Sequence, residues 1–126
     1  MDRVYEQTDI LSLHIPLTVE TRALVNEGYL RRFKKKIILI NTARGEIVPL
    51  ADLVSLMDEG RVRGAVLDVL ENEKLEKLTT DQRQAFSLLA KRSDVIFTPH
   101  IAGWTYESHV KINVALVQKI KDLRLV

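Results

Sequence analysis

Cysteine is absent from all 126 residues of the chain, which excludes both a disulfide framework and a thiolate metal site. Long apolar runs are missing as well, because runs such as residues 37–40 and 65–67 are far too short to cross a bilayer. Residues 1–6 are polar and lack the apolar core of a signal peptide. These absences favour a cytoplasmic protein without a membrane partner.

A large charge of one sign is also lacking, since the formal net charge is only +2 and charged residues make up 29% of the chain. Apolar residues, at 46%, are sufficient for the core of one domain. The basic run at residues 31–36 lacks the aromatic partners of a nucleic-acid surface and suits a solvated helix end, where cations stabilise the helix dipole. We therefore expect no nucleic-acid partner.

Four short segments rich in β-branched residues stand out against this background. Each is a nearly continuous apolar run, which is typical of strands buried on both faces of a parallel sheet. The predicted strands are residues 9–15, 37–40, 65–70 and 95–98.

Helical patterns separate the predicted strands and follow the last of them. Residues 49–59 begin with a proline and carry an apolar stripe at helical spacing. Asn26 and Thr105 are candidate N-caps for two other helices. The alternation of strand and helix predicts an α/β fold with a parallel sheet in one domain. The remaining predicted helices are residues 26–33, 80–91 and 105–123.

Polar side chains lie at or just beyond the end of every predicted strand. His14 is near the end of the first strand, Arg44 follows the second, and His100 follows the fourth. Glu71 and Glu73 come after the third. Ligands of open α/β sheets bind outside the carboxyl ends of the strands, and parallel strands bring those ends to one edge. We therefore expect these side chains to gather at one edge of the sheet.

The residue types in this set match one kind of chemistry. The fork of donors on Arg44 fits a carboxylate or a phosphate, and a histidine beside a carboxylate can donate a proton to a carbonyl oxygen. Taken singly, Arg44 could pair with Glu46 at the surface, His100 could be a structural histidine, and Glu73 could be a solvated loop acid. Taken together, they predict reduction of a 2-oxo acid, provided that a cofactor supplies hydride.

Four segments carry a more specific signal. They read LHIPLT at residues 13–18, INTARG at 40–45, GAVLDV at 64–69 and TPHIAG at 98–103. In order and in spacing they resemble consecutive signatures of the D-isomer-specific 2-hydroxyacid dehydrogenases, a family of phosphoglycerate, D-lactate, glycerate and hydroxypyruvate enzymes. The resemblance covers residues 8–110.

The resemblance implies the second half of a Rossmann-type doubly wound parallel sheet, with four strands and a C-terminal helix. It implies NAD as the cofactor, with NADP as the alternative, and a small 2-hydroxy or 2-oxo acid as the substrate. Arg44 would bind the substrate carboxylate, His100 would act as general acid and base, and Glu73 would pair with His100 and keep it protonated. Asp68 would contact the nicotinamide end of the cofactor, and no metal is implied. The implied cofactor contacts are His14, Ile15, Pro16, Thr42, Ala43, Arg44, Asp68, His100, Ala102 and Gly103.

The chain also departs from the family pattern. None of its five glycines forms the G-x-G-x-x-G loop that binds a pyrophosphate at a helix N-terminus. Residues 1–126 are therefore expected to be a partial NAD-binding domain, without its glycine-rich first half and without a substrate domain. Lys74 stands where many members have proline, which leaves Glu71 open as the alternative partner of His100.

An incomplete domain of this kind has consequences for activity and assembly. We expect the chain alone to be inactive and to form a homodimer, because its first strand would present an open apolar edge that invites pairing with another chain. The alternative to an NAD-dependent oxidoreductase is a non-enzymatic, NAD-responsive binding module of the corepressor kind. Such a module would have no need of Arg44, Glu73 and His100 together.

Overall fold

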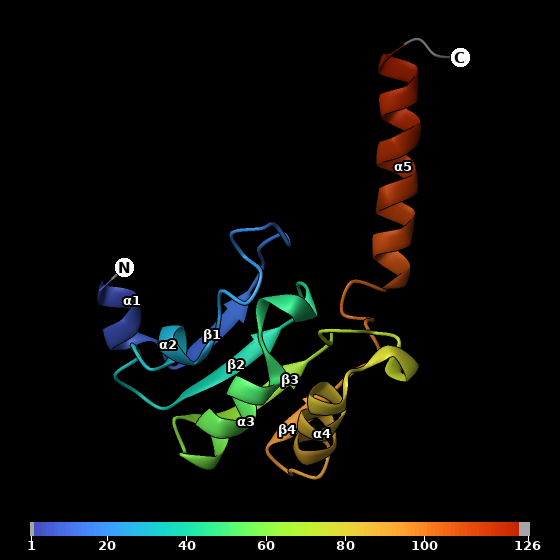
Figure 1. Ribbon diagram of the computed structural model, residues 1–126. Helices are drawn as coiled ribbons and strands as arrows, with labels where there is room; N and C mark the ends of the chain where they lie inside the picture. The colour runs from blue at the N-terminus through green and yellow to red at the C-terminus, as the bar shows by residue number, and fades with distance from the viewer. Residues whose placement is uncertain (1, 124–126) are drawn as a thin grey trace.

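Four strands in chain order form one sheet, and every neighbouring pair is parallel (Figure 1). This computed structural model describes residues 2–123. The prediction of an α/β fold built on four parallel strands is confirmed. The strands are β1 (Ile10–Leu13), β2 (Ile37–Asn41), β3 (Val62–Leu67) and β4 (Val95–Phe97).

The helices agree with the sequence patterns where those patterns are long. The predicted N-caps are confirmed, since the side chains of Asn26 and Thr105 accept hydrogen bonds from the amides of Tyr29 and Ser108. The helices are α1 (Asp2–Gln7), α2 (Glu27–Leu30), α3 (Leu50–Asp58), α4 (Thr80–Leu89) and α5 (Tyr106–Asp122), with 3-10 turns η1 (Gly45–Ile47) and η2 (Leu75–Lys77).

Two short helices differ from expectation. Helix α2 is a single turn, where residues 26–33 were expected to be helical, because the chain turns after Leu30 towards β2. Helix α1 was not predicted, and its one buried residue explains why: Tyr5 packs edge-on against the rings of Tyr29 and Phe33. A helix anchored by one aromatic side chain shows no apolar periodicity.

The third strand is shifted towards the N-terminus relative to the prediction of residues 65–70. It begins at Val62, which pairs with Ile37, although exposed Arg63 interrupts the apolar run. It ends at Leu67, and the amide of the next residue, Asp68, donates to the Asn41 carbonyl. Asp68 therefore lies just beyond the strand.

The expectation that the strands are buried on both faces is wrong. Helices α3 and α4 pack side by side against one face, where Leu39 and Leu67 are fully buried (Figure 1). On the opposite face Ile10 and Ile96 are 56% and 57% exposed. The strands look doubly buried in sequence because residues on the uncovered face are apolar as well.

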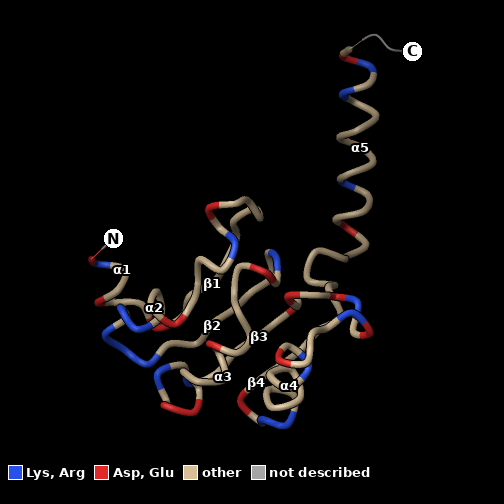
Figure 2. Tube along the Cα trace, viewed as in Figure 1, with Lys and Arg blue, Asp and Glu red and all other residues tan. Residues whose placement is uncertain are grey.

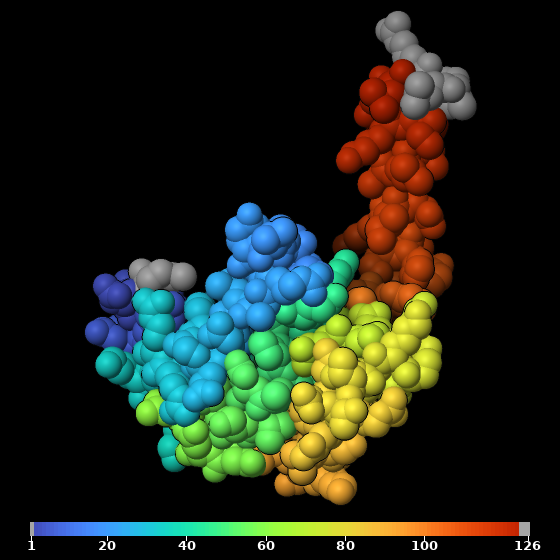
Figure 3. All heavy atoms as spheres, in the orientation of Figure 1, coloured from blue at the N-terminus to red at the C-terminus, as the bar shows by residue number. Residues whose placement is uncertain are grey.

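Helix α5 projects away from the body of the protein (Figures 1 and 3). None of its residues is buried, and its apolar side chains face solvent. No helix within residues 2–123 has the length and apolar content needed to cross a membrane. The exposed apolar side chains of α5 are Val110, Ile112, Val114, Leu116 and Val117.

The basic run at residues 31–36 lies before β2, at the end of the sheet opposite the strand carboxyl ends (Figure 2). Arg31 pairs with Glu27 and Glu59, and Lys35 pairs with Asp9. The Arg32 guanidinium lies 4.2 Å from the centroid of the Tyr5 ring. The run thus follows the end of α2 and precedes β2, in agreement with its interpretation as a solvated helix end before a buried strand.

Candidate functional site

The carboxyl ends of the four strands are in register. Leu13 pairs with Asn41, Asn41 with Leu67, and Leu67 with Phe97. The residues that follow each strand therefore emerge along one edge of the sheet, as parallel pairing predicts. This row brings together the loops that carry His14, Arg44, Asp68, Glu73 and His100.

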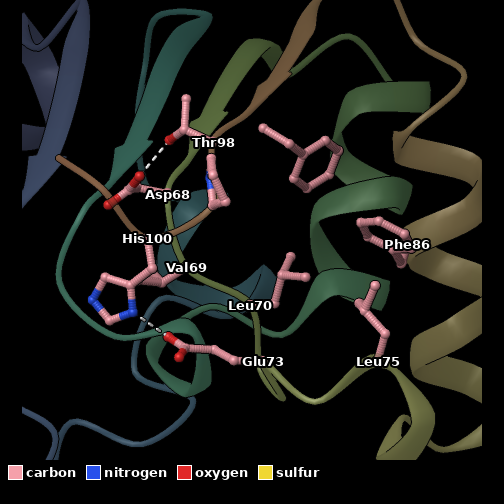
Figure 4. A pocket seen from close by; sticks show the side chains of 10 residues that line it. Asp68, Val69, Leu70, Glu73, Leu75, Phe86, Thr98 and His100 are labelled. Carbon is pink, nitrogen blue, oxygen red and sulfur yellow. Dashed lines mark hydrogen bonds and ion pairs between the residues drawn. The ribbon is translucent and has the colours of Figure 1, made fainter.

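A close polar contact at this edge joins His100 and Glu73. His100 Nδ1 lies 2.6 Å from Glu73 Oε1, and the two side chains are 43% and 51% exposed (Figure 4). Glu71, the alternative partner, instead accepts a hydrogen bond from the Leu50 amide at 2.8 Å. The geometry therefore assigns Glu73, and not Glu71, as the carboxylate beside His100.

The backbone of His100 occupies the left-handed region, with φ 54°, which is uncommon for a residue other than glycine. The carboxylate of Asp68 holds this turn, accepting hydrogen bonds from the Ile101 and Ala102 amides, both at 2.9 Å, and from the Thr98 hydroxyl. Asp68 is only 2% exposed. The loop that presents His100 is thus fixed by a buried carboxylate at the end of β3.

The pKa of Asp68 reflects this environment. Burial alone raises it, but the hydrogen bonds from Thr98, Ala102 and Ile101, with the nearby His100, outweigh burial and leave the pKa below its ordinary value. Hydrogen bonds from amides and a hydroxyl favour the charged form of a carboxylate. Asp68 is therefore a stable anion in the folded protein.

Arg44 lies on a turn that the Asn41 side chain stabilises by hydrogen bonds. The Asn41 side chain accepts from the Ala43 amide at 3.0 Å and donates to the Arg44 carbonyl at 2.9 Å, and Asn41 is 1% exposed. The Arg44 side chain is exposed and donates to the Ala43 carbonyl at 2.6 Å. Its guanidinium makes no ion pair with a described acidic residue, so the proposed surface pair with Glu46 is not formed.

The predicted site residues line three neighbouring depressions, of which two share Arg44 and two share Glu73 and His100. One, of about 540 Å³, is lined by Arg44, Glu73 and His100, together with Lys74. Another, of about 460 Å³, lies beside the Glu73–His100 pair and has a largely apolar wall that includes Phe86 (Figure 4). The remaining depression, of about 490 Å³, is lined by His14, Ile15, Pro16, Leu17, Thr42, Ala43 and Arg44.

The predicted cofactor contacts thus divide into separate places. Those from the first two strand ends share one depression, whereas Asp68 and His100 line the apolar one. Ala102 and Gly103 lie in the exposed turn after His100. Among residues 2–123, no three His, Asp or Glu side chains gather closely enough to hold a metal ion.

Two residues that shape the site were not singled out from the sequence as site residues. Asn41 orders the Arg44 turn, and its signal is a polar residue that ends an otherwise apolar strand. Gly45 packs so closely on Leu70 that a Cβ would lie 1.8 Å from the Leu70 carbonyl carbon. No local sequence pattern reveals that second contact, because its partner is distant in the chain.

Residues 1–102 match the family model described as D-isomer specific 2-hydroxyacid dehydrogenase, NAD binding domain. The chain belongs to this family. Glyoxylate reductase from Thermofilum pendens is 42% identical over 112 residues, which are 89% of this chain and 31% of that protein. Hydroxypyruvate reductase from Thermotoga maritima is 35% identical over 122 residues, 95% of this chain and 37% of that protein.

Solved structures of the family have the same fold. D-lactate dehydrogenase from Aquifex aeolicus, complexed with NAD and lactic acid, aligns with a TM-score of 0.80 at 35% identity, covering 97% of this chain and 39% of that one. The NAD-complexed D-isomer specific 2-hydroxyacid dehydrogenase from Lactobacillus delbrueckii aligns with a TM-score of 0.79 at 33% identity, covering 98% and 39%. The chain thus spans about a third of the length of the curated relatives it matches.

NAD is the cofactor of this family's domain, and the residues present fit one part of its site. The depression beside the first two strand ends is open and has small side chains, Thr42 and Ala43, in its wall. A pyrophosphate needs a glycine-rich turn at a helix N-terminus, and the sequence has no G-x-G-x-x-G. The fit therefore extends to the region near Arg44 and His100, and not to the phosphates.

Proposed function

We propose that this chain is part of an NAD-dependent D-2-hydroxyacid dehydrogenase, in which it supplies the side chains that transfer the proton and bind the substrate carboxylate. One observation carries the proposal: His100 and Glu73 lie 2.6 Å apart in a depression that Arg44 also lines. The substrate would be a small 2-oxo acid or the corresponding 2-hydroxy acid, as the names of the relatives suggest.

His100 is the proposed general acid and base. Because Glu73 contacts Nδ1, Nε2 is the ring nitrogen left to meet the substrate oxygen. In the reductive direction His100 donates a proton to the carbonyl oxygen, and in the oxidative direction it removes the hydroxyl proton. Glu73 orients the imidazole through its contact with Nδ1.

Arg44 is the proposed carboxylate-binding residue. Its guanidinium is exposed and offers paired donors that match the two oxygens of a carboxylate. A substrate held between Arg44 and His100 would occupy the depression that both residues line, and its reacting carbon, C2, would have to face the nicotinamide of the cofactor. NAD, when bound, would supply or accept the hydride at that carbon.

The exposure of the site bears on what the chain needs for activity. His100 and Glu73 are both about half exposed, so residues 2–123 do not exclude water from the pair. We infer that the remainder of a longer polypeptide would cover them.

A homodimer and a cytoplasmic location are further predictions. The non-enzymatic alternative is less consistent with the site, because ligand binding alone requires no proton donor.

The proposal is tested by a chimera in which this chain replaces the matching 112-residue segment of the Thermofilum pendens glyoxylate reductase. We expect glyoxylate-dependent oxidation of NADH, which His100→Gln should lower by a factor of about 100 or more, as removal of a general acid does. Glu76→Ala is the matched control, since Glu76 is exposed in η2 and lies outside the site. A folded chimera that binds NADH but reduces no 2-oxo acid would contradict the proposal.

A further inference from the structure

Helix α3 begins without a cap of its own. Its N-cap residue is Pro49, which makes no side-chain hydrogen bond to the helix. The first amide of a helix has no partner within the helix and needs one from elsewhere. Glu71 provides it, because Glu71 Oε2 accepts from the Leu50 amide at 2.8 Å, across 21 positions of the chain. A carboxylate is also the charge that a helix N-terminus favours.

The same Glu71 side chain also reaches α4. Its other oxygen, Oε1, accepts from Gln82 Nε2 at 3.4 Å. Gln82 is itself held by the capping box of α4, in which it exchanges hydrogen bonds with Thr79. Glu71 thus connects the beginnings of two helices to the loop after β3.

The backbone beside Glu71 is pressed against the Arg44 loop. A Cβ on Gly45 would lie 1.9 Å from the Leu70 carbonyl oxygen and 2.4 Å from the Glu71 amide nitrogen. In the sequence, Arg44 immediately precedes Gly45, and Glu73 follows Glu71 by two residues. A movement of residues 70–71 relative to Gly45 would therefore displace the loop of Glu73 relative to Arg44.

We propose that Glu71 is the positioning residue that fixes the loop of Glu73, and with it the Glu73–His100 pair, relative to Arg44. The expected effect of Glu71 on activity rests on the proposed function, whereas its effect on the position of the loop does not. Glu71 lies in the wall of the depression that Arg44 and His100 line, but both of its carboxylate oxygens are engaged by hydrogen bonds from within the protein. It acts through two hydrogen bonds that hold the loop after β3 against α3 and α4.

The first test is NMR spectroscopy of the 126-residue chain. Glu71→Ala removes both hydrogen bonds, and Glu71→Asp is the milder change, because its shorter side chain no longer reaches the Leu50 amide. Glu71→Gln keeps one acceptor oxygen for the Leu50 amide, although it loses the longer bond from Gln82, and should therefore keep most of the native arrangement. We expect the Ala and Asp variants to shift signals of Arg44, Glu73 and His100, while Gln and the control Glu76→Ala leave them in place.

The second test uses the active chimera at a temperature where every variant is folded. Glu71→Ala should lower kcat/KM by about tenfold to a hundredfold, through a lower kcat and a higher KM, since small misplacements of catalytic groups have effects of that size. Glu71→Gln should recover most of the activity.

The outcomes are separable. If Glu71→Ala and Glu71→Asp shift only signals of α3 and lower the Tm, with Arg44, Glu73 and His100 unmoved, Glu71 is a helix cap and the positioning role is wrong. If the unmutated chimera is inactive, the proposed function fails, yet the spectra of the chain still decide whether Glu71 positions the loop.

Discussion

At the scale of single residues, Arg44 and His100 differ in what they are expected to do for a substrate. Arg44 holds the carboxylate in the ground state and the transition state alike, whereas His100 transfers a proton only as the reaction proceeds. In the chimera, Arg44→Ala should therefore mainly raise KM, and His100→Ala should mainly lower kcat. Steady-state kinetics with glyoxylate and NADH measure both. An Arg44→Ala variant with an unchanged KM would remove the carboxylate assignment.

Asp68 predicts how stability depends on pH. Its pKa is lowered in the folded protein, so its contribution to stability is present above its unfolded pKa, about 3.9, and is lost as pH falls through the folded value. Urea unfolding between neutral pH and pH 3 should show this loss, and Asp68→Asn should make the curve flatter in that acidic range. Glu76→Gln, which removes an exposed carboxylate without touching the loop, should keep the native curve. Equal slopes for Asp68→Asn and the native chain would contradict the assignment.

The residues of the site were predictable to different degrees. Residue types and strand-end positions were enough to indicate Arg44, Glu73 and His100. The choice between Glu73 and Glu71 needed distances, because both follow the same strand and only packing decides which one meets His100. The anchoring of the His100 loop by Asp68 joins residues more than 30 positions apart, and no local pattern contains such a contact.

At the scale of elements, Gly45 in the η1 turn packs more closely on the loop after β3 than any other described glycine packs on its neighbours. A methyl group on Gly45 would overlap the Leu70 carbonyl, so the two backbones would have to separate. We expect Gly45→Ala to lower the free energy of unfolding by about 3 kcal/mol or more, at the upper end for an overpacked site. Gly103→Ala is the matched control, because its Cβ would meet nothing within 4 Å.

Urea unfolding of the two glycine variants at neutral pH provides this measurement. A Gly45→Ala chain as stable as the Gly103→Ala chain would mean that the loop can yield without cost. The stability loss should be accompanied by displaced signals at Arg44, since the same contact sets the position of its turn.

The elements themselves followed from apolar runs and caps, and their errors have physical causes. The strand at Val62 was missed at its start because pairing with β2 stabilises a segment that contains exposed Arg63. Burial on one face rather than two could not be read from composition. The covered and the uncovered face of the sheet are both made of apolar residues, so only the positions of the helices show which face is buried.

At the scale of the whole molecule, the chain alone should not be a working enzyme. Its site is open to water, and it lacks a glycine-rich phosphate loop. We expect the purified 126-residue chain to bind NADH weakly at best and to show no useful turnover of glyoxylate, pyruvate or hydroxypyruvate. Fluorescence titration with NADH and an absorbance assay measure the two properties. Turnover near that of the active chimera would refute the prediction.

The chain should also associate with itself. Strand β1 lies at the edge of the sheet. The exposed side chains of Ile10 and Ile96 make the uncovered face of the sheet apolar, and α5 presents an apolar stripe that includes Val110 and Val114. Exposed edges and apolar patches of this kind promote association. Light scattering over the micromolar range should show species larger than one chain. A constant mass of 14.4 kDa at all concentrations would rule out the association.

The isolation of α5 has a consequence for cooperativity. A helix that buries no side chain gains almost nothing from tertiary packing, which is the main source of helix stability in proteins. In the dilute chain, α5 should therefore melt gradually, apart from the single transition of the sheet and its helices, and it should add little to the heat capacity of unfolding. When chains associate and cover Val110 and Val114, the same segment should join the cooperative transition. Mean residue ellipticity at 222 nm would then become more negative as protein concentration rises, so that helix content itself reports assembly.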